Sequence, residues 1–141
     1  MRKKQKTISK TKIEQQCLSL WSLCVRTRDR VCRVCGSDYR LQGHHIRSRS
    51  NKATFLDLEN GMAVCARCHI IQKFNPERFQ DTILSVIGDE EYQRLKVKSQ
   101  RIWKPTVKDL LMMKDSLKLS LKMLESEYGK SDAKILEECG L

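Results

Sequence analysis

The stretch that decides the fold is CRVCGSDYRLQGHHIRSRSNKATFLDLENGMAVCARCHIIQKF, residues 32–74. It opens with one Cys-x-x-Cys pair, and a second pair follows after 29 intervening residues. Each pair can supply two thiolates from one tight turn, so two pairs can enclose a tetrahedral metal ion and leave no open coordination position. The spacing therefore predicts a structural zinc ion bound by Cys32, Cys35, Cys65 and Cys68.

Zinc binding would compensate for the few large apolar residues of this stretch, because metal binding and folding are coupled in such small units. The chain has seven cysteines, many for 141 residues. Disulfides are disfavoured in a reducing cytosol, where clustered cysteines indicate metal binding instead. Cys17, Cys24 and Cys139 lack the paired spacing. We expect Cys17 and Cys24 to be small buried residues on a helix.

Hydrophobic periodicity predicts an α+β fold around this stretch. Two short strands are expected at residues 39–46 and 61–64, joined by a polar basic loop at 47–51 and followed by a helix at 66–74. A helix at 13–28 precedes them, and further helices are expected at 76–86, at 90–99 and from residue 106 to a stop near Gly129. The chain thus divides into a basic tail (1–12), a helix with the zinc-containing core (13–75) and a helical extension (76–141).

All three histidines of the chain, His44, His45 and His69, lie between or beside the cysteine pairs. Adjacent residues of a strand point to opposite sides, so the rings of His44 and His45 should diverge. His69 directly follows Cys68, at the start of a helix whose position the zinc ion would fix. One ring of the pair and His69 can therefore converge on a second metal ion while the other ring stays free.

The charge of the chain is +11 and unevenly distributed. Residues 1–60 hold 14 Lys and Arg against 5 Asp and Glu, whereas residues 61–141 hold 14 against 12. A basic N-terminal half is typical of proteins that bind a polyphosphate. No stretch approaches the roughly 18 apolar residues of a membrane span, and the basic N-terminus is not followed by a signal-peptide region. We therefore expect a soluble, cytoplasmic protein without a membrane partner.

Three short motifs resemble the HNH endonuclease family: Gly-His-His-Ile at 43–46, Glu-Asn at 59–60 and Cys-Ala-Arg-Cys-His at 65–69. The resemblance covers residues 32–75 and implies a zinc-stabilised ββα-metal core. Outside it, LWSLCVRTRD at 20–29 and Gly-Asp-Glu-Glu at 88–91 are similar to phage NinG-like recombination proteins. This second resemblance implies a phage-encoded enzyme acting in the cytoplasm of the host cell.

The HNH resemblance also implies roles for individual residues. His45 would be the general base, and His44 and His69 would bind one catalytic divalent cation (Mg²⁺, Mn²⁺ or Ni²⁺). Asn60 would hold the loop that orients the base. The reaction implied is metal-dependent hydrolysis of double-stranded or branched DNA to 5′-phosphate and 3′-hydroxyl ends. Two arginines of the basic loop would contact DNA phosphates without reading sequence: Arg47 and Arg49.

Three other interpretations remain open from the sequence. The chain could be a non-catalytic zinc-containing module that binds nucleic acid, or the histidines could join the cysteines as zinc ligands. It could also be a virion or packaging adaptor. Its C-terminal helices could bind a second copy or a protein partner, because the apolar stripe along the last helix suits either a core or a dimer seam. If the protein is a nuclease, three biological roles compete: recombination, genome packaging, and homing or restriction.

Overall fold

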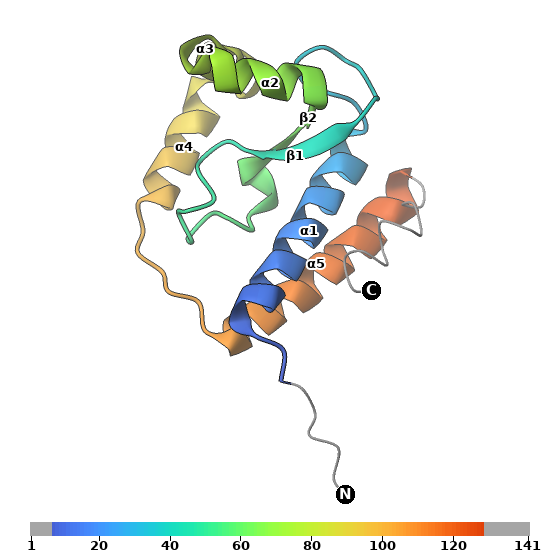
Figure 1. Cartoon of the computed structure of the whole chain (residues 1–141), viewed down its shortest axis with the longest axis vertical. Coiled ribbons are helices and arrows are strands. Elements are labelled where there is room, and N and C mark those ends of the chain that lie inside the picture. Colours follow the sequence, from blue (N-terminus) through green and yellow to red (C-terminus); the bar gives the residue numbers. More distant parts are fainter. Residues whose placement is uncertain (1–6, 129–141) are drawn as a thin grey trace, which may run out of the picture.

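The computed structural model describes residues 7–128, which form five α-helices and one pair of antiparallel strands (Figure 1). A single 3₁₀ turn, η1 (Leu58–Asn60), leads into the second strand. The predicted tail residues 1–6, the helix stop at Gly129 and Cys139 lie outside the described residues. In chain order the main elements are α1 (Lys10–Asp29), β1 (Leu41–His45), β2 (Gly61–Cys65), α2 (Ala66–Phe74), α3 (Pro76–Ile87), α4 (Asp89–Ser99) and α5 (Val107–Tyr128).

Each predicted helix and strand is present, and the differences lie at their ends. The first helix starts at Lys10 rather than at residue 13, because the Ser9 hydroxyl caps it by accepting a hydrogen bond from the Lys12 N–H at 3.3 Å. The first strand is shorter than predicted, because Arg40 adopts a φ of 50° that a strand cannot contain. Gly88, with a φ of 84°, separates α3 from α4 at the predicted position.

The strand β2 is buried along its whole length and separates two hydrophobic clusters. Side chains alternate along a strand. Ala63 accordingly joins the cluster around α1 and α5, whereas Met62 and Val64 join the cluster beneath α3 and α4. In the antiparallel register, His44 lies opposite Met62 and His45 lies opposite Gly61. The two histidines therefore sit beside different clusters.

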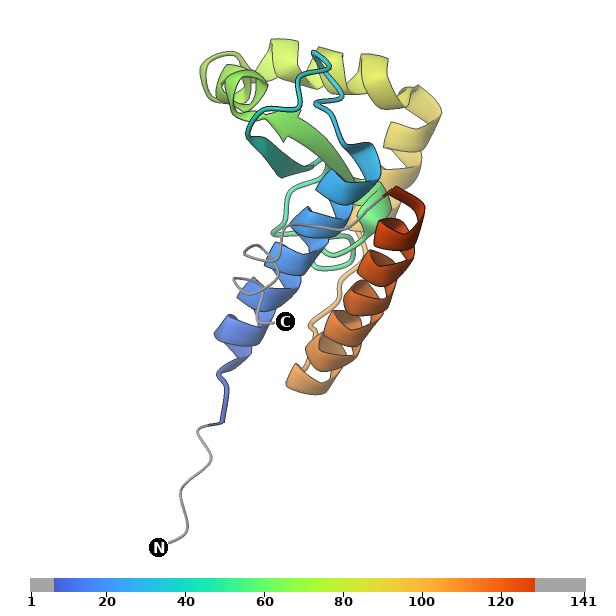
Figure 2. The ribbon, with the colours of Figure 1, turned by 90° about the vertical axis from the view of Figure 1, so that its right-hand side faces the viewer.

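The helices α1 and α5 lie side by side and run in the same direction (Figures 1 and 2). The Cys17 thiol donates to the Leu110 carbonyl at 3.4 Å, and the Cys24 thiol donates to the Leu117 carbonyl at 3.5 Å. From the first contact to the second, the residue number rises by seven on both helices, so the two helices run parallel. The prediction that Cys17 and Cys24 are buried on a helix is confirmed.

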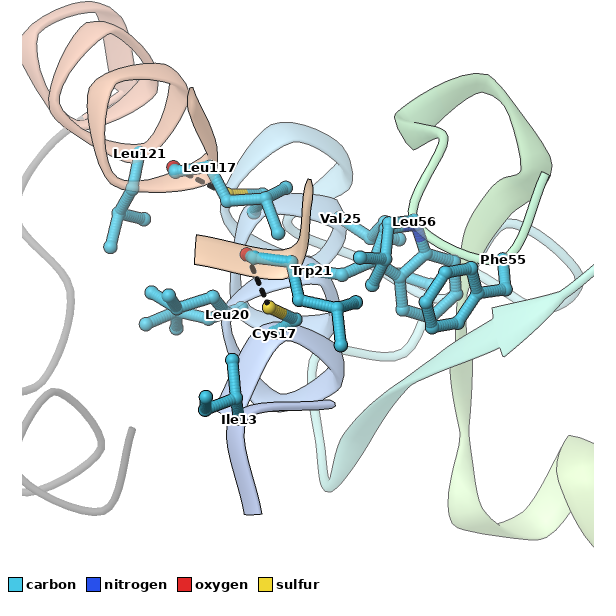
Figure 3. Packing of buried hydrophobic residues seen from close by; sticks show 13 residues of the cluster. Ile13, Cys17, Leu20, Trp21, Val25, Phe55, Leu56, Leu117 and Leu121 are labelled. Carbon is cyan, nitrogen blue, oxygen red and sulfur yellow. Dashed lines mark hydrogen bonds between the residues drawn. The ribbon is translucent and has the colours of Figure 1, made fainter. Parts of the chain in front are cut away.

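The apolar stripe of α5 belongs in large part to this intramolecular core. Leu110, Leu117 and Leu121 are buried in one cluster with Cys17 and Leu20, and Figure 3 shows Leu117 and Leu121 pointing from α5 into this cluster. The same cluster therefore draws residues from both ends of the described chain. None of the helices within residues 7–128 is long and apolar enough to cross a membrane.

Candidate metal centre and active-site pocket

The four cysteine sulfurs come together in one cluster. The Sγ atoms of Cys32, Cys35, Cys65 and Cys68 all lie within 4.8 Å of one another, and those of Cys35 and Cys65 are 3.6 Å apart. A tetrahedral zinc site with bonds of about 2.3 Å places its sulfurs roughly 3.8 Å apart. The cluster therefore fits a zinc ion. Among residues 7–128 no histidine joins this group, so the geometry disfavours the interpretation in which the histidines are zinc ligands.

The local backbone explains how the cluster forms. Gly36 adopts a φ of 79°, and its N–H donates to the Cys32 carbonyl at 2.8 Å, which closes the first turn. In the second pair, Cys65 caps α2, because its sulfur accepts a hydrogen bond from the Cys68 N–H at 3.4 Å. Helix α2 therefore starts at the metal site, and a bound zinc ion would hold both α2 and the end of β2.

The environment of the sulfurs suits a cation. Burial raises the pKa of Cys32, but hydrogen bonds from the backbone N–H groups of Cys65, Cys35 and Val34 outweigh it and bring the pKa to about 7. Burial raises the pKa of Cys68, and the neighbouring thiols raise it further. Four thiolates can share so small a volume only when a cation neutralises them, which is the chemistry of a structural zinc site.

His44 lies on β1 with its ring directed toward α2 and α3. Its ring centroid is 5.3 Å from that of His69 and 4.9 Å from that of Phe79, with both contacts edge-on. The residue is 6% exposed, and its ring makes no hydrogen bond to another of the described residues. Burial, followed by the nearby His69 and His45, lowers the pKa of His44 to about 4. At neutral pH the ring is therefore a neutral imidazole with a free lone pair.

His69 stands in the first turn of α2 and is oriented by a neighbour on β1. Its Nδ1–H donates to the Oε1 atom of Gln42. Because Nδ1 carries the proton, the lone pair of the ring resides on Nε2. This is the usual arrangement of a metal-binding histidine. The role of Gln42 was not predicted. The signal for it was the two-residue period of β1, which places Gln42 on the same side as His44.

His45 has a different environment, on the face of β1 that packs against α1. Its ring stacks on the indole of Trp21, with centroids 3.8 Å apart and planes inclined by 10°. Its Nε2–H donates to the Phe55 carbonyl at 2.9 Å, so the lone pair of the neutral ring resides on Nδ1. The pKa of His45 is lowered, chiefly by burial. The hydrogen bond to Phe55 raises the pKa, whereas the positive charges of Arg49 and Lys52 lower it further.

Asn60 is fully buried and fastens the loop between the strands. Its Oδ1 accepts a hydrogen bond from the Arg47 N–H at 2.7 Å, and its Nδ2 donates to the carbonyls of Arg47 at 3.0 Å and Thr54 at 3.1 Å. Residues on both sides of the loop are thereby tied to one side chain. This arrangement supports the predicted role of Asn60 as a residue that holds the loop rather than as a metal ligand.

The three histidines line one pocket of about 520 Å³, together with residues of the basic loop and of α3. Arg49 also lines it, and its exposed guanidinium forms no ion pair or hydrogen bond within the described residues. Arg47 is placed differently. Its guanidinium donates to the Ser99 hydroxyl at 3.1 Å and to the Tyr92 hydroxyl at 2.9 Å, which fastens the loop to α4.

The end of α1 also holds the core, a role that the sequence did not predict. Arg28 donates to the carbonyls of Leu58 at 2.8 Å and Gly61 at 2.7 Å, while Asp29 accepts a hydrogen bond from the Ala63 N–H at 2.8 Å. Arg28 and Asp29 also form an ion pair with each other. The signal was present in LWSLCVRTRD at residues 20–29, which supplied only a resemblance to NinG-like proteins and part of the predicted helix at 13–28.

Comparison with known families agrees with this geometry. Residues 32–73 match the family model described as HNH endonuclease. No curated protein and no solved structure matches the chain. The matched segment contains both cysteine pairs, the three histidines and Asn60, whereas α1, α3, α4 and α5 lie outside it. An HNH domain is a nuclease or nucleic-acid-binding module. Over residues 32–73, this chain is therefore similar to the HNH endonuclease family.

Proposed function

We propose that this protein is a metal-dependent DNA endonuclease that hydrolyses phosphodiester bonds. The observation that carries the proposal is that His44, His45 and His69 all line one pocket, each with its own hydrogen-bonding state. His44 takes no hydrogen bond in the described chain, His69 is tied through Nδ1 to Gln42, and His45 is tied through Nε2 to a backbone carbonyl. Such a division suits two metal ligands and one base.

His45 acts as the general base in this proposal. Its Nδ1 lone pair accepts a proton from the water that attacks the phosphorus atom. The lowered pKa of His45 keeps the ring neutral, and therefore able to accept a proton, at neutral pH. The Phe55 carbonyl accepts the Nε2–H bond before and after proton transfer, so the ring does not have to turn during the reaction.

His44 and His69 would hold the catalytic cation. A divalent ion bound there would act as a Lewis acid for the phosphate and the leaving oxygen. Two imidazole ligands favour Mn²⁺ or Ni²⁺ over Mg²⁺, since nitrogen donors prefer softer ions. Gln42 contributes by fixing the ring of His69, and the cysteine cluster contributes by fixing the start of α2.

Double-stranded or branched DNA is the proposed substrate, bound through phosphates by the basic N-terminal half. Arg49 supports this, because its free guanidinium lies at the pocket. Arg47, with partners on α4, would act by holding the loop in place. The flanking sequences at 20–29 and 88–91 support a phage recombination, branched-DNA or packaging role in the host cytoplasm. A homodimer or protein partner would use the outer face of α5, where Leu119 and Met123 are exposed.

The test is a cleavage assay on plasmid, linear, flap and four-way-junction DNA. The protein is treated with a mild chelator that spares thiolate-bound zinc, and Mn²⁺, Ni²⁺ or Mg²⁺ is then added. We expect cleavage only with an added ion, and a loss of about 10²–10⁴-fold for His45→Ala purified in the same way. DNA binding without cleavage under every condition would overturn the proposal and indicate a non-catalytic zinc-containing module.

A further inference from the structure

The indole of Trp21 lies flat against the ring of His45, although Trp21 belongs to α1, outside the segment that matches the HNH family. The centroids are 3.8 Å apart and the planes differ by 10°, so the two rings share most of one face. Between residues 7 and 128 the ring of His44 has no such stacked partner, since Phe79 and His69 meet it edge-on. Stacking therefore distinguishes the proposed base from the proposed metal ligand.

The surrounding residues leave room for this contact and fix it. Gly61 lies opposite His45 in the sheet, and a Cβ at that position would lie 2.6 Å from Cζ2 of Trp21 and 2.5 Å from Cγ2 of Val25. Real Cβ atoms essentially never approach so closely, so the absence of a side chain at Gly61 is what lets the indole reach His45. Trp21 is 1% exposed, and Figure 3 shows it between α1 and the loop that carries Phe55.

The indole and the imidazole are also tied to the same loop. The Trp21 Nε1–H donates to the Asp57 carbonyl at 2.8 Å, and the His45 Nε2–H donates to the Phe55 carbonyl at 2.9 Å. The two acceptor carbonyls are two residues apart. A change in the position of the indole would therefore disturb both the face and the hydrogen-bonded edge of the His45 ring.

We propose that Trp21 is a positioning residue for His45, which holds the imidazole plane so that Nδ1 faces the pocket. The inference rests on the proposed function of His45 as general base. The outer torsion of a histidine side chain has a broad, shallow energy profile, so one hydrogen bond restrains the ring plane less than a hydrogen bond and a stacked ring face do together. A flat aromatic surface on one face removes that freedom. Proton transfer depends on such alignment, and a misplacement of about 1 Å can cost roughly 10²-fold in rate.

The test compares Trp21→Leu and Trp21→Phe with wild type at saturating DNA and Mn²⁺, well below the melting temperature of each variant. Trp21→Leu keeps apolar bulk but removes the flat ring, and we expect kcat to fall by about 10–100-fold with KM changed less than about threefold. Trp21→Phe restores a ring face, and we expect it to recover most of that loss. Leu117→Ala is the matched control, because it damages the same hydrophobic cluster without touching the pocket, and its kcat should stay near wild type.

A double variant separates positioning from general damage. If Trp21 acts through His45, Trp21→Leu should cost little more in a His45→Ala background, since the group that it positions is already gone. Gly61→Ala gives an independent check, because the indole must shift while Trp21 itself is retained, and kcat should fall again.

Two results would overturn the inference: equal loss of kcat in the presence and absence of His45, or an unchanged kcat in Trp21→Leu while His45→Ala is impaired. In both cases the proposed nuclease function survives. That function fails instead if wild type shows no metal-dependent cleavage at all.

Discussion

Asn60 pairs with both backbone groups of Arg47, accepting from its N–H at 2.7 Å and donating to its carbonyl at 3.0 Å. The backbone carbonyl of Asn60 also accepts a hydrogen bond from the Ile46 N–H at 2.9 Å. β1 ends at His45, so the Asn60 backbone continues the pairing of the two strands by one residue, to Ile46, and the Asn60 side chain extends it to Arg47. The loop that follows the proposed base therefore starts from a fixed point.

Substitution of Asn60 tests whether these hydrogen bonds stabilise the loop. Asn60→Asp retains an acceptor for the Arg47 N–H but removes the Nδ2 donor, which leaves the carbonyls of Arg47 and Thr54 facing a buried carboxylate. We expect the free energy of unfolding to fall by at least about 1–3 kcal/mol, the range for a broken buried hydrogen bond. Urea denaturation measures this. Asn75→Asp is the control, since Asp is also a good cap for α3, and equal losses in the two variants would contradict the role of Asn60.

The zinc ion should be present in nearly stoichiometric amount after purification. Cys32→Ser and Cys68→Ser should lose zinc and lower the melting temperature strongly, because metal binding is coupled to folding at such a site. Metal analysis and thermal denaturation measure the two effects. Cys17→Ala, which removes a thiol outside the sulfur cluster, should keep its zinc. A zinc-free protein with unchanged stability would show that the cluster has no structural metal.

The two neighbouring histidines should respond differently to metal. His44→Ala removes a proposed ligand, so its activity should recover partly as Mn²⁺ is increased. His45→Ala removes the proposed base, so its kcat should be about 10²–10⁴-fold lower at every Mn²⁺ concentration. Cleavage rates across a Mn²⁺ titration distinguish the two variants. Rescue of His45→Ala but not of His44→Ala would reverse the two roles.

Substitutions of the two arginines of the basic loop should have different effects. Arg49→Ala should weaken DNA binding, since the free guanidinium at the pocket has no other partner in the described chain. Arg47→Ala should instead lower the free energy of unfolding by about 1–3 kcal/mol, because it removes the hydrogen bonds to Ser99 and Tyr92. Filter binding and urea denaturation, applied to both variants, check this. The assignment fails if Arg47→Ala weakens binding while its stability is unchanged.

The N-terminal basic residues should contribute to DNA affinity through phosphates. Deleting residues 2–6 removes Arg2, Lys3, Lys4 and Lys6 and leaves the Ser9 cap of α1 in place. Affinity should fall for all DNA sequences alike, and the slope of log affinity against log salt should flatten by about 0.9 for each duplex phosphate that the deletion leaves without a cationic partner. Titrations at several salt concentrations measure the slope. An unchanged slope of log affinity against log salt would mean that these four basic residues do not contact DNA phosphates.

Local pattern was enough to predict much of the core. The Cys-x-x-Cys spacing predicted the sulfur cluster, and strand alternation predicted that His44 and His45 diverge, as they do toward Phe79 and Trp21. The partners of Arg47 were beyond prediction, because Tyr92 and Ser99 are 45 and 52 residues away in sequence. Trp21 falls within the predicted helix at 13–28, but hydrophobic periodicity does not show which ring its indole contacts.

The parallel pairing of α1 with α5 joins residues 93 positions apart, such as Cys17 and Leu110. A ribosome makes α1 well before residues 107–128, because synthesis proceeds at about 5–20 residues per second. The apolar face of α1 thus emerges long before the helix that covers it, while the other face of α1 is already available to β1. Until α5 is made, it cannot cover this face of α1, so the translation speed between residues 30 and 107 sets how long the face waits for its partner helix.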